Sequence, residues 1–245
     1  MPSMRPSNRV FASPPLDAIG LNLLHPWANR LSAARFAVAG REVDVARAGA
    51  RAMYDPDHPG VPIHGLRSDA WEELGGGRGF RLAFGEAEPE LLAAFPFPHE
   101  IVVEVAVAGA TTTVTTTVTP TGDVAVPISY GFHPYFTFAG VPRAAWVLEL
   151  PEPTAALGAR SYDGPVASVA DGTTLAVADG AGARAAVAFL AGFPVAQVYA
   201  PPAEDLVAIE PMTAPVDALV SGDGLTLVAP GERHVTRFAI ARTPS

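Results

Sequence analysis

The chain has 245 residues, of which 49% are hydrophobic, and it carries a formal net charge of -9 at pH 7. It contains no cysteine and all 16 basic residues are arginine, so it can form neither a lysine Schiff base nor a thiolate nucleophile or metal ligand. The negative charge argues against nucleic acid, whose phosphates it would repel, and against anionic membranes, and it favours a neutral partner.

Most of the chain has the pattern of short β-strands. Glycine and proline interrupt it every few residues, and the apolar residues between these breaks mostly alternate. In chain order, we expect hairpins that join residues 35–39 to 42–47, 100–108 to 111–119 and 173–178 to 184–190, followed by strands at 195–200, 206–209, 225–228 and 234–241. Short helices are expected near residues 69–74 and 88–94. The pattern predicts an all-β protein with large antiparallel sheets.

No Ser-rich or Pro-rich linker and no internal repeat divides the sequence, so we expect a single domain over residues 1–245. The first ten residues lack the apolar core of a signal peptide. The most apolar long window, residues 185–203, is interrupted by Gly192, Pro194 and Gln197 and is a poor membrane span. Together with the absence of cysteine, these features predict a soluble, cytoplasmic protein.

Two side chains are suited to proton transfer near neutral pH. His133 lies in the sequence Gly-Phe-His-Pro-Tyr-Phe, and Glu210 lies in Ile-Glu-Pro-Met-Thr. Each precedes a proline, which restricts it to an extended backbone. Taken separately, both also fit a structural role, His133 as a packed imidazole in a turn and Glu210 as a solvated carboxylate at a strand end. Both interpretations stay open at this point.

Two further segments combine polar groups that could bind a ligand. Residues 26–31 bring together a tryptophan, Asn29 and Arg30, and residues 62–66 place His64 beside a glycine that allows a close approach. Arg30 equally fits a surface ion pair. The histidines are scattered without metal-ligand spacing, and two of them fall in a segment that we read as a loop rich in Pro and Gly, so no metal site is predicted.

The order of these segments carries a family resemblance. The chain resembles the aldose 1-epimerase (galactose mutarotase) family from about Gly20 to Ala241. Each motif alone is weak, and their shared order makes the resemblance specific. The matching segments are the Pro-Trp and Asn-Arg pairs within Gly20–Leu31, Ile63-His64-Gly65, Gly131-Phe132-His133-Pro134-Tyr135, Val198-Tyr199-Ala200-Pro201 and the run from Ile209 to Pro215.

The resemblance implies a β-supersandwich and the interconversion of the α and β anomers of a free aldose, with neither cofactor nor metal. It implies that His133 is the general acid and Glu210 the general base. It also places Asn29, Arg30 and His64 among the residues that bind the sugar. Because a glutamic acid has an ordinary pKa of about 4.3, we expect Glu210 to be ionised at neutral pH and therefore to be the available base.

The chain departs from the family pattern in two places. Only about 20 residues precede the first motif, where the family has an additional N-terminal section, so we expect a sheet edge that is shortened or completed by another subunit. The segment between Leu150 and Leu175 is abbreviated. Asp163 is the best candidate there for the family's sugar-binding aspartate, and Asp163-Gly164 equally fits an ordinary turn.

Three other functions remain compatible with the sequence. A non-catalytic carbohydrate-binding protein of the same fold would need the pocket without both proton-transfer groups. A hexose-phosphate epimerase would need cations at the pocket mouth, for which Arg67 and Arg78 are available. A glycosidase would need a second carboxylate opposite Glu210, and Asp217 is the nearest acid in sequence.

Overall fold

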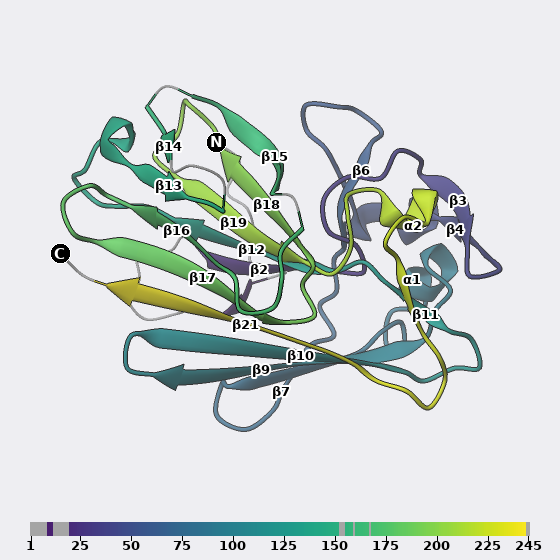
Figure 1. Ribbon diagram of the computed structural model, residues 1–245. Helices are drawn as coiled ribbons and strands as arrows, with labels where there is room; N and C mark the ends of the chain where they lie inside the picture. Colours follow the sequence, from purple (N-terminus) through teal and green to yellow (C-terminus); the bar gives the residue numbers. More distant parts are fainter. Residues whose placement is uncertain (1–8, 12–19, 152–154, 159, 167, 244–245) are drawn as a thin grey trace.

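The computed structural model describes residues 9–11, 20–151, 155–158, 160–166 and 168–243. These residues form two large antiparallel sheets, one of six strands and one of nine (Figure 1). The predicted all-β architecture is confirmed. Most of the N-terminal section, for which the sequence predicts a shortened sheet edge, lies outside the described residues.

The six-stranded sheet holds both residues that the sequence analysis assigns to proton transfer. Its central strands come from the middle and the last third of the chain, so residues far apart in sequence become neighbours. Its strands, in spatial order, are β1 (Arg9–Phe11), β2 (Gly20–Leu24), β12 (Gly131–Phe136), β19 (Val207–Met212), β18 (Val195–Ala200) and β15 (Tyr162–Val166).

The nine-stranded sheet contains the longest strands of the protein. The predicted hairpins at 100–119 and 173–190 are confirmed within it. Its strands, in spatial order, are β14 (Ala155–Ala156), β13 (Val147–Glu149), β16 (Thr174–Ala178), β17 (Arg184–Ala191), β21 (His234–Thr243), β10 (Thr111–Pro120), β9 (His99–Ala108), β8 (Gly79–Ala83) and β7 (Glu72–Glu73).

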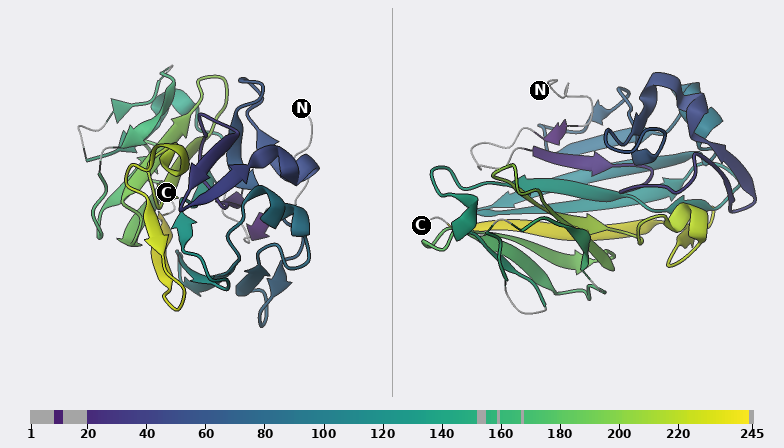
Figure 2. Two further views of the ribbon diagram at one scale, coloured as in Figure 1. Left: turned by 90° about the vertical axis from the view of Figure 1, so that its right-hand side faces the viewer. Right: turned by 90° about the horizontal axis from the view of Figure 1, so that it is seen from above.

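The remaining elements are short. They form the two-stranded sheets β3 (Arg35–Val38) with β4 (Arg41–Asp44), β5 (Ala52–Tyr54) with β6 (Pro62–Leu66), and β11 (Val126–Ile128) with β20 (Thr226–Val228), the α-helices α1 (Pro89–Ala94) and α2 (Ala218–Ser221), and the 3-10 helices η1 (Val45–Arg51) and η2 (Arg143–Ala145). Figure 2 shows that β3, β4 and the two α-helices gather at one end of the long strands. None of the described helices is long and apolar enough to cross a membrane.

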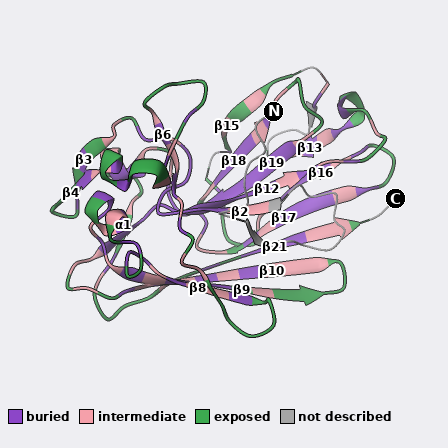
Figure 3. Cartoon of the chain, turned by 180° about the vertical axis from the view of Figure 1, so that it is seen from behind, coloured by how far each residue is buried: buried purple, intermediate pink, exposed green. Residues whose placement is uncertain are grey.

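One hydrophobic core cluster draws residues from both large sheets. The ring of Phe132 on β12 lies 5.0 Å from that of Phe238 on β21, and Phe193 packs against both of them. Figure 3 shows that the central strands β12 and β19 are mostly buried. Because successive side chains of a strand point to opposite faces, Phe132 in the core places His133 on the outer face of the six-stranded sheet.

The predicted helix near residues 69–74 is wrong. Glu72–Glu73 form β7, which pairs with β8, and the carboxylate of Glu72 binds Arg81 across the two strands at 2.8 Å. Three consecutive glycines, residues 75–77, all have positive φ and turn the chain back into this hairpin. A segment this short takes the conformation that its sheet partner offers. The second predicted helix is confirmed as α1, which Pro89 begins.

Candidate active site

His133 and Glu210 face each other from neighbouring strands. The strands β12 and β19 are paired through Gly131 with Met212 and through Tyr135 with Ala208, and His133 and Glu210 lie midway between these two pairs. The Nε2 atom of His133 lies 3.2 Å from the Oε1 atom of Glu210, and both side chains are buried. The sheet register therefore brings the two predicted catalytic residues into contact.

Polar side chains extend this pair into a row across the sheet. Asn22 on β2 is paired with His133, and Gln197 on β18 is paired with Glu210. The Nε2 group of Gln197 donates a hydrogen bond of 2.8 Å to Oδ1 of Asp163 on the edge strand β15. Asp163 therefore lies in a strand beside the site and not in a turn. Asn22 and Gln197 were not predicted, because a polar residue that alternates with apolar ones in a strand also fits an ordinary solvated face.

A second chain segment brings Arg30 and His64 together. Asn29 and His64 both have φ near +58°, and the N–H of His64 donates a hydrogen bond of 2.9 Å to the carbonyl of Asn29. Arg30 and Ile63 form an antiparallel bridge within the same pairing. His64 thus lies on β6, so its assignment to a loop was wrong. The Oδ1 of Asn29 accepts a hydrogen bond of 2.8 Å from the Arg30 N–H, which fixes this unusual backbone.

Only glycine fits directly after His64, because the neighbouring backbone leaves no room for a Cβ atom. A Cβ at Gly65 would lie 2.1 Å from the carbonyl oxygen of His25, and Gly65 has φ +84°. The N–H of Leu66 donates a hydrogen bond of 2.9 Å to that same carbonyl. The close approach of these two backbones holds β6 against the segment that carries Arg30.

Aromatic rings surround His133. The His64 ring lies edge-on to it, with ring centroids 5.4 Å apart, and the Tyr135 ring stacks on it at 4.3 Å. The hydroxyl of Tyr135 lies 3.4 Å from Nε2 of His133, the same nitrogen that faces Glu210. These contacts fix the imidazole plane and leave a single nitrogen directed toward Glu210.

Arg30 is held by carboxylates on two sides. Its Nε donates to Oδ2 of the buried Asp55 at 2.5 Å, and its guanidinium lies 3.6 Å from Asp163. Asp55 also accepts hydrogen bonds from the Asp57 N–H and from the His58 ring. The bond with Arg30 holds the pKa of Asp55 well below its usual range. The alternative of an ion pair for Arg30 is thus correct, and this ion pair adjoins the candidate site.

Burial shifts the proton affinities of the central pair. It raises the pKa of Glu210 well above its ordinary value, with a smaller upward contribution from Asp163, and it lowers the pKa of His133 well below its ordinary value. Burial also lowers the pKa of His64 to about 4. The expectation of an ionised Glu210 rests on the ordinary pKa of a glutamate in water, and desolvation of this buried site shifts both partners toward their neutral forms.

Several buried polar atoms of the row lack a hydrogen-bond partner within the protein. Of eight such side-chain atoms among the described residues, four belong to this site: Nδ1 of His64, Nδ1 of His133, Oε1 of Gln197 and Oε2 of Glu210. Buried polar atoms are rarely left unpaired. Their concentration here marks this row as a place where a polar ligand could bind.

The residues that other functions would need lie elsewhere. Asp217 accepts a hydrogen bond of 2.7 Å from the Ser32 N–H and does not extend the row beside Glu210. Within the described ranges, no three His, Asp or Glu side chains are grouped so that they could hold a metal ion.

The fold is that of galactose mutarotase-like proteins. A protein from Synechocystis sp. PCC 6803 is 20% identical, with a TM-score of 0.72 over 92% of this chain and 78% of that one. A galactose mutarotase-like protein from Clostridium acetobutylicum is 15% identical, with a TM-score of 0.70 over 92% and 80% of the two chains. A galactose mutarotase related enzyme from Lactobacillus acidophilus is 13% identical, with a TM-score of 0.67 over 92% and 83%.

The family model of aldose 1-epimerase matches residues 14–154, more than half of the chain. The chain therefore belongs to the aldose 1-epimerase family. No curated protein matches the sequence.

Proposed function

We propose that the protein is an aldose 1-epimerase that interconverts the α and β anomers of a free aldose. The observation that carries the proposal is the buried contact of 3.2 Å between His133 and Glu210, with Arg30 and His64 beside it. Mutarotation needs a proton donor and a proton acceptor near two oxygens that are bonded to the same carbon, C1. A pair of groups in contact meets that requirement.

In the proposed reaction, Glu210 accepts the proton of the anomeric hydroxyl while protonated His133 donates a proton to the ring oxygen. The bond between C1 and the ring oxygen breaks, and an open-chain aldehyde forms. Rotation about the bond between C1 and C2, followed by the reverse transfers, gives the other anomer. Every proton that leaves one group is taken up by another, so the cycle consumes no co-reactant.

This reaction needs one proton on the pair, held by His133. In the ligand-free site burial opposes that ion pair, and the nearby charge of Arg30 favours it by lowering the pKa of Glu210. Hydroxyl groups of a bound sugar would add hydrogen bonds to the charged forms and promote the transfer of the proton from Glu210 to His133. Sugar binding would thus prepare the pair for catalysis.

Polarimetry of freshly dissolved α-glucose and α-galactose tests the proposal. The protein should accelerate the change in optical rotation. Glu210→Gln and His133→Asn should each lose the acceleration by a factor of about 10² or more while retaining the circular dichroism spectrum of the folded protein. Acceleration that persists in either folded variant would refute the assigned roles. Binding of sugar without any acceleration by the parent protein would instead favour a non-catalytic carbohydrate-binding protein.

A further inference from the structure

Carboxylates lie on three chain segments that adjoin the strands and segments of the candidate site. Asp55 begins the segment between β5 and β6, and Asp57 follows two residues later, with its N–H bonded to Oδ1 of Asp55 at 2.8 Å. Asp163 lies on the edge strand β15. Glu204 lies in the turn that joins β18 to β19.

Three of these carboxylates face solvent. Asp57 and Glu204 are exposed, and the side chain of Asp163 is 40% exposed. Asp163 is paired in the sheet with Tyr199, which lies on the same strand as Gln197, and Glu204 lies in the turn that follows this strand. Burial raises the pKa of Tyr199, and the charges of Glu204, Asp163 and Asp57 raise it further. The solvent-exposed surface beside the site therefore carries several negative charges.

Little positive charge offsets these carboxylates. Arg30 binds Asp55 and lies 3.6 Å from Asp163. In the part of the chain that the structure describes, no other arginine forms an ion pair with Asp55, Asp57, Asp163 or Glu204, and the sequence contains no lysine.

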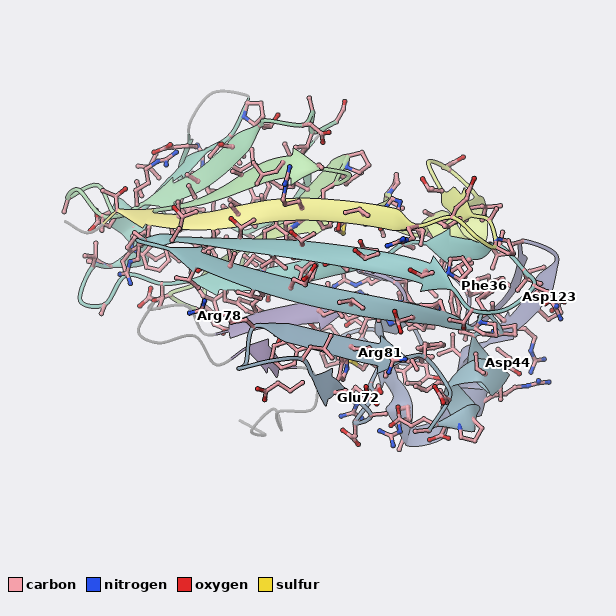
Figure 4. The ribbon with its side chains drawn as sticks, turned by 90° about the horizontal axis from the view of Figure 1, so that it is seen from below. Phe36, Asp44, Glu72, Arg78, Arg81 and Asp123 are labelled. Carbon is pink, nitrogen blue, oxygen red and sulfur yellow. The ribbon has the colours of Figure 1, made fainter. Side chains whose placement is uncertain are left out.

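Arg67 and Arg78 are the two residues that the sequence offers for binding a phosphate group. Both make contacts other than with these carboxylates. Arg67 donates a hydrogen bond of 2.7 Å to the carbonyl of Ala50. Arg78 follows the glycine-rich turn between β7 and β8, on the nine-stranded sheet (Figure 4). There it contributes to a groove of about 450 Å³, whose other lining residues include Leu74, Glu104, Thr113 and Thr115. Because Thr113 and Thr115 alternate with the buried Val114, this groove lies on the outer face of that sheet, across the sandwich from His133.

We propose that Asp57 and Glu204 select the substrate of this site by charge. They admit neutral aldoses, favour amino sugars that carry a protonated amine, and repel aldoses that carry a phosphate group. The proposal rests on the proposed epimerase function and assigns to these two residues a role in specificity and none in proton transfer. A phosphate carries a charge of about -1.5 to -2 at pH 7, so each carboxylate repels it over a distance limited mainly by salt screening.

Anomer exchange measured by NMR at equilibrium tests the proposal on matched sugars. Glucose and galactose are each compared with their 6-phosphates, and glucose is compared with glucosamine, at pH 7 and low ionic strength. We expect kcat/KM for the phosphorylated sugars to be at least about tenfold below that for the parent sugars, and kcat/KM for glucosamine to be higher than that for glucose. The difference should shrink when salt is raised to about 0.3 M.

The double variant Asp57→Asn with Glu204→Gln should raise kcat/KM for the 6-phosphates at least about threefold relative to the parent sugars. The matched control, Asp123→Asn with Glu42→Gln, removes the same charge from two exposed positions and should leave the ratio unchanged. Asp123 lies beside the β3–β4 hairpin in Figure 4.

Two results would overturn the charge selection and leave the epimerase proposal intact. The first is a kcat/KM for the phosphorylated sugars that equals that for the parent sugars. The second is a ratio of these two kcat/KM values that is the same in the double variant as in the parent protein. If none of the sugars is accelerated, the epimerase proposal fails and the charge selection fails with it.

Discussion

His133 lies directly opposite Glu210 across the β12–β19 pairing, with its Nε2 atom 3.2 Å from Oε1 of the carboxylate. Both side chains are buried, and burial shifts each pKa toward the neutral form. Burial thus favours the form in which Glu210 holds the proton and His133 is neutral, whereas the proposed reaction requires the proton on His133.

The pH profile of kcat/KM should reflect the protonation of this pair. The burial shifts place the addition of a second proton well below pH 6.5 and the loss of the last proton well above pH 4.5. We expect a bell-shaped profile whose acidic limb lies well below pH 6.5, because burial lowers the pKa of His133 and because His64, whose pKa is about 4, is neutral at pH 6.5 as well. Initial rates of anomer exchange between pH 4 and pH 9 provide the measurement. An acidic limb centred near pH 6.5 would show that His133 titrates as an exposed histidine does.

Asp55→Asn should weaken sugar binding. The variant removes the charge that anchors Arg30 while keeping the shape of the side chain. We expect KM to rise about tenfold with a smaller change in kcat, and the free energy of unfolding to fall by about 2 kcal/mol, the usual contribution of a charge-assisted hydrogen bond. Anomer-exchange kinetics and urea unfolding measure the two effects. An unchanged KM would remove Arg30 from the substrate-binding residues.

The control for Asp55→Asn is Asp44→Asn. It breaks an ion pair of 2.8 Å with Arg35, whose side chain is 74% exposed, on the β3–β4 hairpin visible in Figure 4. Because Arg35 is solvated and far from the candidate site in the fold, the control should change neither KM nor stability appreciably.

The protein should lose stability in mild acid because of a buried histidine pair. The Nε2 atoms of His25 and His99 lie 2.8 Å apart, and burial lowers the pKa of His99 to about 4. The unfolded chain therefore binds more protons between pH 6.5 and pH 4, and stability falls as the pH decreases through this range. His99 alone contributes a loss of about 2 kcal/mol between pH 7 and pH 5. In urea unfolding, His99→Gln should show a loss smaller by that amount, and an equal loss would contradict the assignment.

Gly131→Ala should disturb the contact between His133 and Glu210. A Cβ at Gly131 would lie 2.7 Å from the carbonyl oxygen of Pro211, so β12 and β19 must separate. We expect a loss of about 1 to 3 kcal/mol in stability and a decrease in kcat larger than any change in KM. Gly164→Ala is the control, because its Cβ would meet no atom within 4 Å. Wild-type kcat in a destabilised Gly131→Ala variant would show that catalysis tolerates a wider separation.

The extended backbone on both sides of the site could be predicted from the sequence alone. Proline after His133 and after Glu210 excludes helix at these positions, and alternating apolar residues identify the strands around them. The order of the motifs along the chain was sufficient to identify the family. This order is a property of the sequence and does not depend on which residues make contact in the fold. Roles for Asn29, Arg30, His64 and Asp163 in sugar binding stay predictions.

Only the tertiary structure decided which polar groups meet and how they ionise. The pairing of β12 with β19 brings together two residues separated by more than 70 positions in sequence, and register of this kind depends on how whole sheets pack. Gln197 and Asn22 entered the row through the same register. The direction in which burial shifts the His133–Glu210 pair could not be read from reference pKa values, because these apply to groups in water and both side chains are buried.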